Sequence, residues 1–222
     1  MSSKGTGRDD APGLLPGVHD ALRDFDVVDS AVYLAVAATQ TPALDRGLRC
    51  LSAAADHSKI SLTVAGLLAI RRGPTRQAAL HGVAAVATAS AVANLLGKHL
   101  VRRPRPEREA QTNPQRHVPM PKSASFPSGH TASAFAFAFA VGSVLPVTAV
   151  PLGALAMAVG YSRVHTGVHY AGDVAAGALV GIAAAAAVAA AANRYGIGPG
   201  PGQCASRVAH RAYGPGACTV NR

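Results

Sequence analysis

The chain has 222 residues, of which 49% are hydrophobic and only 14% are charged, and its formal net charge is +10. Ordinary soluble domains carry roughly 25% charged residues, so the composition argues against a soluble protein and favours a single domain that spans a membrane. A basic chain can also bind nucleic acid. However, seven lysines and arginines cluster between Lys98 and Lys122, and the sequence shows no nucleic-acid-binding fold pattern. We therefore do not expect nucleic acid as a partner.

The N-terminal quarter is the least regular part. Residues 1–26 are polar, contain several glycines and prolines and lack the apolar core of a secretory signal, so we expect a flexible tail. Residues 27–56 carry a short apolar run and then an amphipathic pattern, with a break before Pro42. We expect two short helices that lie at the membrane surface or are partly inserted. A first full span over these residues is the alternative.

Two apolar stretches follow, over residues 58–71 and 77–101, with a compact basic turn between them. The first is shorter than the ~20 residues that a span needs, unless it extends back into residues 53–57. Residues 102–127 then form a polar loop rich in arginine and proline. A loop of this length is uncommon unless it is functional.

Three more helices are predicted after the loop, over residues 129–145, 152–164 and 169–193. Ser128 is suited to the N-cap of the first helix, and glycines among the alanines of the last one allow close helix approach. The pattern predicts an all-α, integral-membrane helical bundle of about five to six transmembrane helices. The membrane-embedded domain would cover residues 27–193, and residues 194–222 would form a flexible Gly/Pro-rich tail.

Three short motifs carry the candidate chemistry. They are K-x6-R-P with Lys98 and Arg105, P-S-G-H ending at His130, and S-R-x5-H-x3-D with Arg163, His169 and Asp173. If a helix begins near His169, Asp173 lies one turn further on the same face. Its carboxylate can then accept the proton of one imidazole nitrogen and leave the other nitrogen as a nucleophile. Arg163 would hold an anion against that nucleophile.

The expected helix directions bring these motifs together. Helices end near Lys98 and Arg163 and begin near His130 and His169, so all three motifs fall at one membrane face. The opposite face carries arginines in the short loop after residue 70 and in the C-terminal tail. Because positively charged loops tend to stay in the cytoplasm, we expect a multi-pass cell-membrane protein with its site on the extracytoplasmic face.

In this order the three motifs resemble the signature of the type 2 phosphatidic acid phosphatase superfamily. This group includes membrane lipid-phosphate phosphatases and shares its site with bacterial acid phosphatases and vanadium haloperoxidases. Every defining position matches, and the one nearby difference is Ala171, where many members carry a proline. The resemblance implies that His169 forms a phosphohistidine and that Asp173 orients it. It also implies that His130 protonates the leaving alkoxide and then activates water.

The three motifs also supply candidate phosphate-binding residues, which we call the phosphate clamp. Lys98, Arg105 and Arg163 would surround the phosphate, while Ser128 would donate through its hydroxyl and Gly129 through its backbone N–H at a helix N-terminus. We expect no metal and no other cofactor, because three cations would supply the charge. The substrate would be a phosphorylated lipid in the bilayer: phosphatidic acid, phosphatidylglycerol phosphate, or a polyprenyl phosphate or diphosphate.

Several other readings stay open. A vanadate-dependent haloperoxidase would use the same cradle, although its relatives are larger soluble bundles, and a non-catalytic membrane scaffold would keep the site without turnover. His165, His169 and Asp173 have the spacing of a metal triad, but Thr166 and Gly167 disfavour one helix through them. We interpret Arg102, Arg103, Arg108 and Arg116 as topology markers or headgroup anchors. Cys204 and Cys218 could pair only in an oxidising compartment.

Overall fold

The computed structural model describes residues 16–99, 103–108 and 113–196, and these residues form helices and connecting turns without a strand. The predicted tail segments 1–15 and 197–222 lie outside the described residues, as do Cys204 and Cys218. Cys50 is exposed and free. The helices are α1 (Pro16–Ala38), α2 (Pro42–Ala54), α3 (Lys59–Ala69), α4 (Pro74–His99), α5 (Gly129–Val144), α6 (Ala149–His165) and α7 (Ala171–Arg194), with short 3-10 turns η1 (Asp56–Ser58), η3 (Pro114–Arg116) and η4 (Pro146–Thr148).

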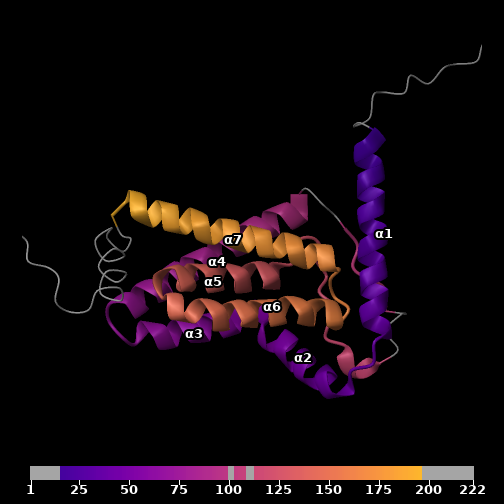
Figure 1. Ribbon diagram of the computed structural model, residues 1–222, viewed down its shortest axis with the longest axis horizontal. Coiled ribbons are helices and arrows are strands. Elements are labelled where there is room, and N and C mark those ends of the chain that lie inside the picture. Colours follow the sequence, from indigo (N-terminus) through magenta and orange to yellow (C-terminus); the bar gives the residue numbers. More distant parts are fainter. Residues whose placement is uncertain (1–15, 100–102, 109–112, 197–222) are drawn as a thin grey trace, which may run out of the picture.

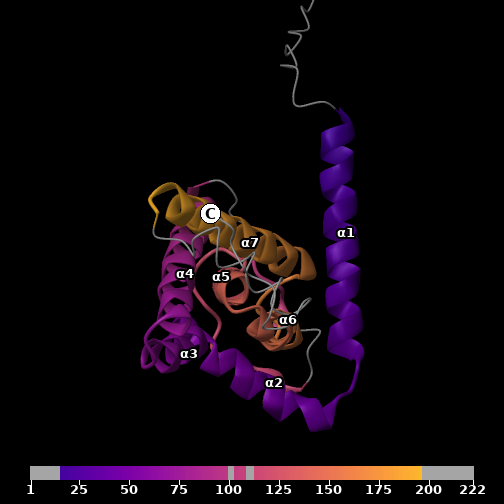
Figure 2. The same ribbon diagram turned by 60° about the vertical axis from the view of Figure 1, so that its left-hand side comes forward.

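Helices α3 to α7 lie side by side as a bundle, with α5 in its middle (Figures 1 and 2). The centre of the bundle is built almost wholly from alanine, including Ala89 of α4, Ala136 of α5 and Ala185 of α7. Such short side chains let helix backbones approach closely, which is how membrane helices gain van der Waals contact. Phe137 and Val141 form a second apolar cluster with α3 and α4.

Among the described residues, three segments are long and apolar enough to cross a membrane: Pro74–Leu95, Pro146–His165 and Ala171–Arg194. Helix α5 is a shorter apolar helix that packs among them. The predicted all-α, integral-membrane bundle is therefore confirmed. Helix α3 spans 11 residues, fewer than the ~20 that a span needs, so the count of five or six spans stays a prediction.

Helix α1 corrects the expected start of ordered structure. Residues 16–26, predicted to belong to a flexible tail, are the first part of this helix. Proline suits the first turn of a helix, and the polar residues that suggested a tail are compatible with a largely exposed helix. Of residues 24–38, Asp29 and Tyr33 are the buried ones. The break before Pro42 is confirmed, because α2 begins there.

The four motif-bearing helix ends lie together, as predicted. Helices α4 and α6 end, and α5 and α7 begin, at the same end of the bundle (Figure 1). Helix α1 runs past this end, across the direction of α5, α6 and α7 (Figure 1). The basic turn with Arg71 and Arg72 lies between α3 and α4, at the opposite end of the bundle.

A buried charge cluster joins α2, α6 and the polar loop beneath the motif end. The Asp45 carboxylate accepts from Nε of Arg116 at 2.9 Å and lies 3.0 Å from Nε2 of His165. Arg116 is only 3% exposed, and its other nitrogens bind carbonyl groups at the end of α1. The interpretation of Arg116 as a surface marker is therefore wrong: a buried carboxylate needs a compensating cation.

Packing of α7 on α5 depends on glycine. A Cβ atom at Gly181 would collide with the carbonyl oxygen of Ala132 and lie 2.8 Å from the backbone nitrogen of Ala136. We predict that Gly181→Ala lowers the free energy of unfolding by about 1–3 kcal/mol, because the helices must separate. Thermal unfolding in detergent measures this loss. Gly153→Ala in α6, where a Cβ meets nothing within 4 Å, is the matched control. An equal melting temperature for both variants would contradict the prediction.

Candidate active site

His169 lies before helix α7 and not inside it, which corrects the expected helix start. The helix begins at Ala171 with Tyr170 at its N-cap. The backbone N–H groups of Val168 and His169 donate to the carbonyl oxygen of Arg163, and Gly167 adopts a left-handed φ of 67° to close this turn. The loop therefore folds back on the end of α6, and His169 lies directly before the N-cap of α7.

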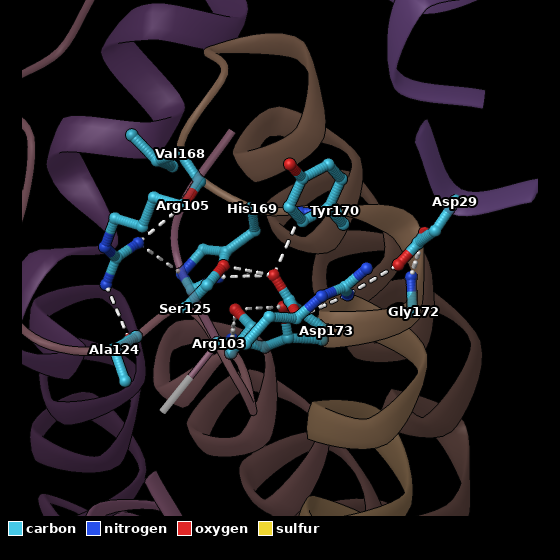
Figure 3. A network of polar contacts seen from close by, with 12 residues as sticks. Asp29, Arg103, Arg105, Ala124, Ser125, Val168, His169, Tyr170, Gly172 and Asp173 are labelled. Atoms are coloured by element: carbon cyan, nitrogen blue, oxygen red, sulfur yellow. Dashed lines mark hydrogen bonds and ion pairs between the residues drawn. The ribbon is translucent and has the colours of Figure 1, made fainter. Parts of the chain in front are cut away.

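Histidine and aspartate still meet, by a different geometry from the predicted one. Asp173 is in the first turn of α7, and its Oδ2 accepts from the backbone N–H of Tyr170 at 3.0 Å. The same oxygen lies 3.4 Å from Nδ1 of His169 (Figure 3). The carboxylate thus reaches back over the helix N-terminus, where backbone N–H groups favour an anion.

Asp173 is fully buried and has two further partners that are not defining positions of the sequence motifs. The hydroxyl of Ser125 donates a short hydrogen bond to its Oδ2, and Nη1 of Arg103 donates to its Oδ1 at 3.1 Å (Figure 3). Arg103 also lies over the Tyr170 ring, 4.2 Å from its centroid. Arg103 is therefore no surface marker, and its place two residues before Arg105 in the motif loop was the available signal.

Arg105 fixes the other side of the His169 ring. Its Nη1 donates to the carbonyl oxygen of Val168 at 2.6 Å and lies 3.3 Å from Nε2 of His169. Its remaining nitrogens bind Ser123 and Ala124 of the polar loop. Since a guanidinium can only donate, Nε2 is the acceptor and carries no proton. The ring is therefore a neutral imidazole with its proton on Nδ1, facing Asp173.

Burial sets the protonation state of His169. Removal from water disfavours the charged imidazolium and lowers the pKa of His169 to about 4, although Asp173 opposes the shift and Arg105 adds to it. An unperturbed histidine titrates near 6.5. The ring nitrogen that faces Arg105 is therefore unprotonated throughout the neutral range.

His130 lies in the first turn of α5 and faces a residue that the sequence did not single out. Its Nε2 lies 2.8 Å from Oδ1 of Asp56, and the same oxygen is 3.8 Å from Nη1 of Arg163. Asp56 belongs to η1, whose next two residues, His57 and Ser58, both have left-handed φ angles near 55°. Strained backbone of this kind concentrates at functional sites.

The predicted clamp residues have different surroundings. Arg163 is buried and donates through Nη1 to the Ser52 hydroxyl at 2.7 Å. Ser128 is the N-cap of α5, as predicted, and its buried hydroxyl oxygen accepts from Thr131. Gly129 lies at the wall of a cavity. The side chain of Lys98 lies outside the described part of the structure.

That cavity has a volume of about 770 Å³ and brings His130, His169 and Arg105 together. Lys122 lies on its wall, and the hydroxyl groups of Ser90 and Ser133, 3.1 Å apart, line it between α4 and α5. A cavity of this size suits a small headgroup. The metal triad considered from spacing is not formed, because His165 binds Asp45 away from His169.

Comparison with known proteins gives consistent results. The model of the PAP2 superfamily matches residues 78–196. A decaprenylphosphoryl-5-phosphoribose phosphatase of Mycobacterium tuberculosis is 38% identical over 157 residues, which cover 68% of this chain and 83% of the relative. A bacitracin transport permease protein, BcrC, of Bacillus licheniformis is 48% identical over 58 residues, covering 26% of this chain and 29% of that protein.

Two solved structures share the fold. LpxE of Aquifex aeolicus has a TM-score of 0.61 at 25% identity and covers 72% of this chain and 94% of its own. A transmembrane PAP2-type phosphatidylglycerolphosphate phosphatase of Bacillus subtilis has a TM-score of 0.60 at 21% identity, covering 81% and 88%. The likeness of the second supports the helical arrangement alone.

We predict that His169 stays neutral well below pH 6. In ¹⁵N-histidine NMR of the detergent-solubilised protein, with His169→Ala to assign the signal, its titration should have a midpoint near pH 4. Because the unfolded histidine binds its proton near pH 6.5, folding stability from this group is complete above pH 6.5. It is lost as the pH falls towards 4. A midpoint above pH 6 would overturn this account of the burial.

Proposed function

The chain belongs to the PAP2 superfamily, and from this premise we propose that it hydrolyses the phosphate of a polyprenyl-linked lipid through a phosphohistidine, with His169 as nucleophile. The observation that carries the mechanism is the orientation of one ring. His169 Nδ1 faces Asp173, while Nε2 faces Arg105 in the cavity shared with His130. A neutral imidazole held in this way has its lone pair where a phosphate on Arg105 would lie.

In the first step, the lone pair of His169 Nε2 attacks phosphorus while the bond from phosphorus to the leaving oxygen breaks. A protonated His130, whose charge is favoured by Asp56 at 2.8 Å and by the substrate dianion, donates its proton to that oxygen, so the lipid alcohol leaves neutral. Asp173 stabilises the positive charge that develops on the His169 ring, because its Oδ2 lies 3.4 Å from Nδ1. The product of this step is a phosphohistidine.

In the second step, His130, now neutral, takes a proton from water as the water oxygen bonds to phosphorus. The bond from phosphorus to Nε2 breaks, and its electron pair returns to His169. Phosphate leaves and His130 is again protonated, so the cycle closes. Transition-state charge on the equatorial oxygens would be met by Arg105, Arg163 and Lys98 together with the Gly129 N–H, and no step needs a metal.

The proposed substrate class is supported by the mycobacterial relative and by the residues that line the cavity. The mycobacterial relative is named for a phosphate on a ribose joined to decaprenyl phosphate, and its similarity extends over most of this chain. Hydroxyl groups of Ser90 and Ser133 line the cavity, with Lys122 also on its wall. These groups suit a sugar and a second phosphate between the reacting phosphorus and a lipid tail that stays in the bilayer.

We also place the site on the extracytoplasmic face. The turn between α3 and α4 carries Arg71 and Arg72, and Arg76 follows in the first turn of α4, at the end of the bundle opposite to the motifs. A short, strongly basic loop favours the cytoplasmic side. The motif end is also basic, but Arg103 and Arg116 of its loop are neutralised there by buried carboxylates.

Phosphate release by the purified, detergent-solubilised protein tests the activity. The panel is decaprenylphosphoryl-5-phosphoribose, a polyprenyl monophosphate and diphosphate, phosphatidic acid and phosphatidylglycerol phosphate, with a chelator present. We expect release that persists in chelator, is fastest on a polyprenyl-linked substrate, and falls by about 10³-fold or more in His169→Ala. His130→Ala should also be strongly impaired, whereas His117→Ala in the polar loop serves as the control. Turnover that survives His169→Ala would refute the mechanism.

Membrane topology has a separate test. In a cysteine-free background, Met120→Cys in the motif loop and Val147→Cys in η4 present exposed thiols at opposite ends of the bundle. A membrane-impermeant maleimide added to intact cells should label Met120→Cys, and should label Val147→Cys only after permeabilisation. The reverse pattern would place the site in the cytoplasm.

A further inference from the structure

One arginine joins two buried carboxylates that come from opposite ends of the chain. Nη1 of Arg103 donates to Oδ2 of Asp29 at 2.6 Å and to Oδ1 of Asp173 at 3.1 Å (Figure 3). Asp29 is on α1 and is only 4% exposed. Asp29 lies outside the three catalytic motifs and Arg103 occupies a variable position of K-x6-R-P, yet Arg103 links Asp29 to the carboxylate that orients the nucleophile.

Asp29 also binds the start of α7 directly. Its Oδ1 accepts from the backbone N–H of Gly172 at 2.8 Å (Figure 3), so a side chain of α1 satisfies a free donor at the helix N-terminus. The fit leaves no room for a side chain at residue 172. A Cβ there would lie 2.7 Å from Oδ2 of Asp29 and 2.5 Å from the Phe25 ring. Helix α1 is thus seated against the residue next to Asp173.

We propose that Asp29 is a positioning residue for the His169–Asp173 pair, acting through Arg103, and that α1 is therefore part of the catalytic apparatus. The proposal rests on the mechanism proposed above. Asp29 lies on the far side of Arg103 from Asp173 and holds the guanidinium between the two carboxylates. The Asp173 carboxylate then keeps its Oδ1 on Arg103 and its Oδ2 on the side of His169 Nδ1.

Loss of the Asp29 charge is expected to shift Arg103 towards Asp173. With a neutral amide at residue 29, Arg103 is no longer shared, and its guanidinium can close on Asp173 as a two-point pair. That movement draws the carboxylate away from Nδ1 of His169 and weakens its hold on the ring. Chemistry slows because the nucleophile is misplaced, while substrate binding changes little, because Asp29 does not line the cavity and Arg103 stays on its wall.

Asp29→Asn is the direct test, because asparagine keeps the size of the side chain. We expect kcat on the best substrate to fall by about 10- to 100-fold, with KM changed by less than about twofold. Asp26→Asn is the matched control. Asp26 is on the same helix and 2.8 Å from Nη2 of Arg103, but its side chain is 68% exposed, and an exposed ion pair contributes little. An equal loss in Asp26→Asn would overturn the proposal.

A double-mutant cycle separates positioning from simple docking of α1. Arg103→Lys keeps the charge but cannot bridge two carboxylates in the same way. If Asp29 acts through Arg103, Asp29→Asn should cause no further loss of kcat in the Arg103→Lys background. The same loss in both backgrounds would refute the coupling.

A second variant tests whether docking of α1 alone explains the effect. Tyr33→Phe removes another contact of α1, its hydrogen bond to the Glu107 carbonyl, and should leave kcat unchanged. A comparable loss there would assign the effect to docking.

A measurement without turnover distinguishes this proposal from the proposed function. The ¹⁵N-histidine NMR signals of His169 should shift in Asp29→Asn and stay unchanged in Asp26→Asn, in protein without substrate. If no lipid is hydrolysed but the Asp29→Asn shift is present, the proposed function fails and the positioning contact stands. If wild-type activity is present and neither kcat nor the His169 signals change in Asp29→Asn, the positioning role is wrong.

Discussion

The buried carboxylate of Asp173 is the constraint on which the rest of the site depends. A fully buried anion is costly unless it is paired and hydrogen-bonded, and here Arg103, Ser125 and the Tyr170 backbone supply that compensation. These groups come from the polar loop and from the start of α7. The contacts of the loop between α4 and α5 with the bundle end are therefore needed to keep the Asp173 carboxylate beside His169.

The membrane bundle supplies the rigid frame for this loop. Helices α4, α5 and α7 are held together by alanine and glycine contacts, which leave little freedom for one helix to slide against another. The carbonyl oxygen of Asp173 accepts from the backbone N–H of Ser128, directly before α5. The start of α7 is thereby tied to the start of α5, so His169 and His130 keep their relative positions.

Sequence patterns predicted the parts of this arrangement that depend on local spacing. The helices after residue 58, the shared motif end and the pairing of His169 with Asp173 follow from hydrophobic runs and from the motif. The helical start of α1 at residues 16–26 was missed, because the polar contacts of this helix, at Asp26, Asp29 and Tyr33, are made with residues more than 70 positions away. For the same reason no pattern could show that Arg103 binds two buried aspartates, or that Asp56 faces His130. Whether a charged side chain is buried depends on tertiary contacts.

Three arginines of the polar loop differ in the groups that they bind. Arg103 is committed to Asp29 and Asp173, and Arg116 to Asp45, so their charges stabilise the fold of the motif end and are not free for a phosphate. Arg105 is different, because its described partners are carbonyl and hydroxyl oxygens and the His169 ring. Its positive charge is therefore uncompensated by a direct ion pair, beside the ring nitrogen that holds the free lone pair. A cluster of arginines that looks uniform in the sequence thus contains one cation placed for an incoming anion and two that hold aspartates in place.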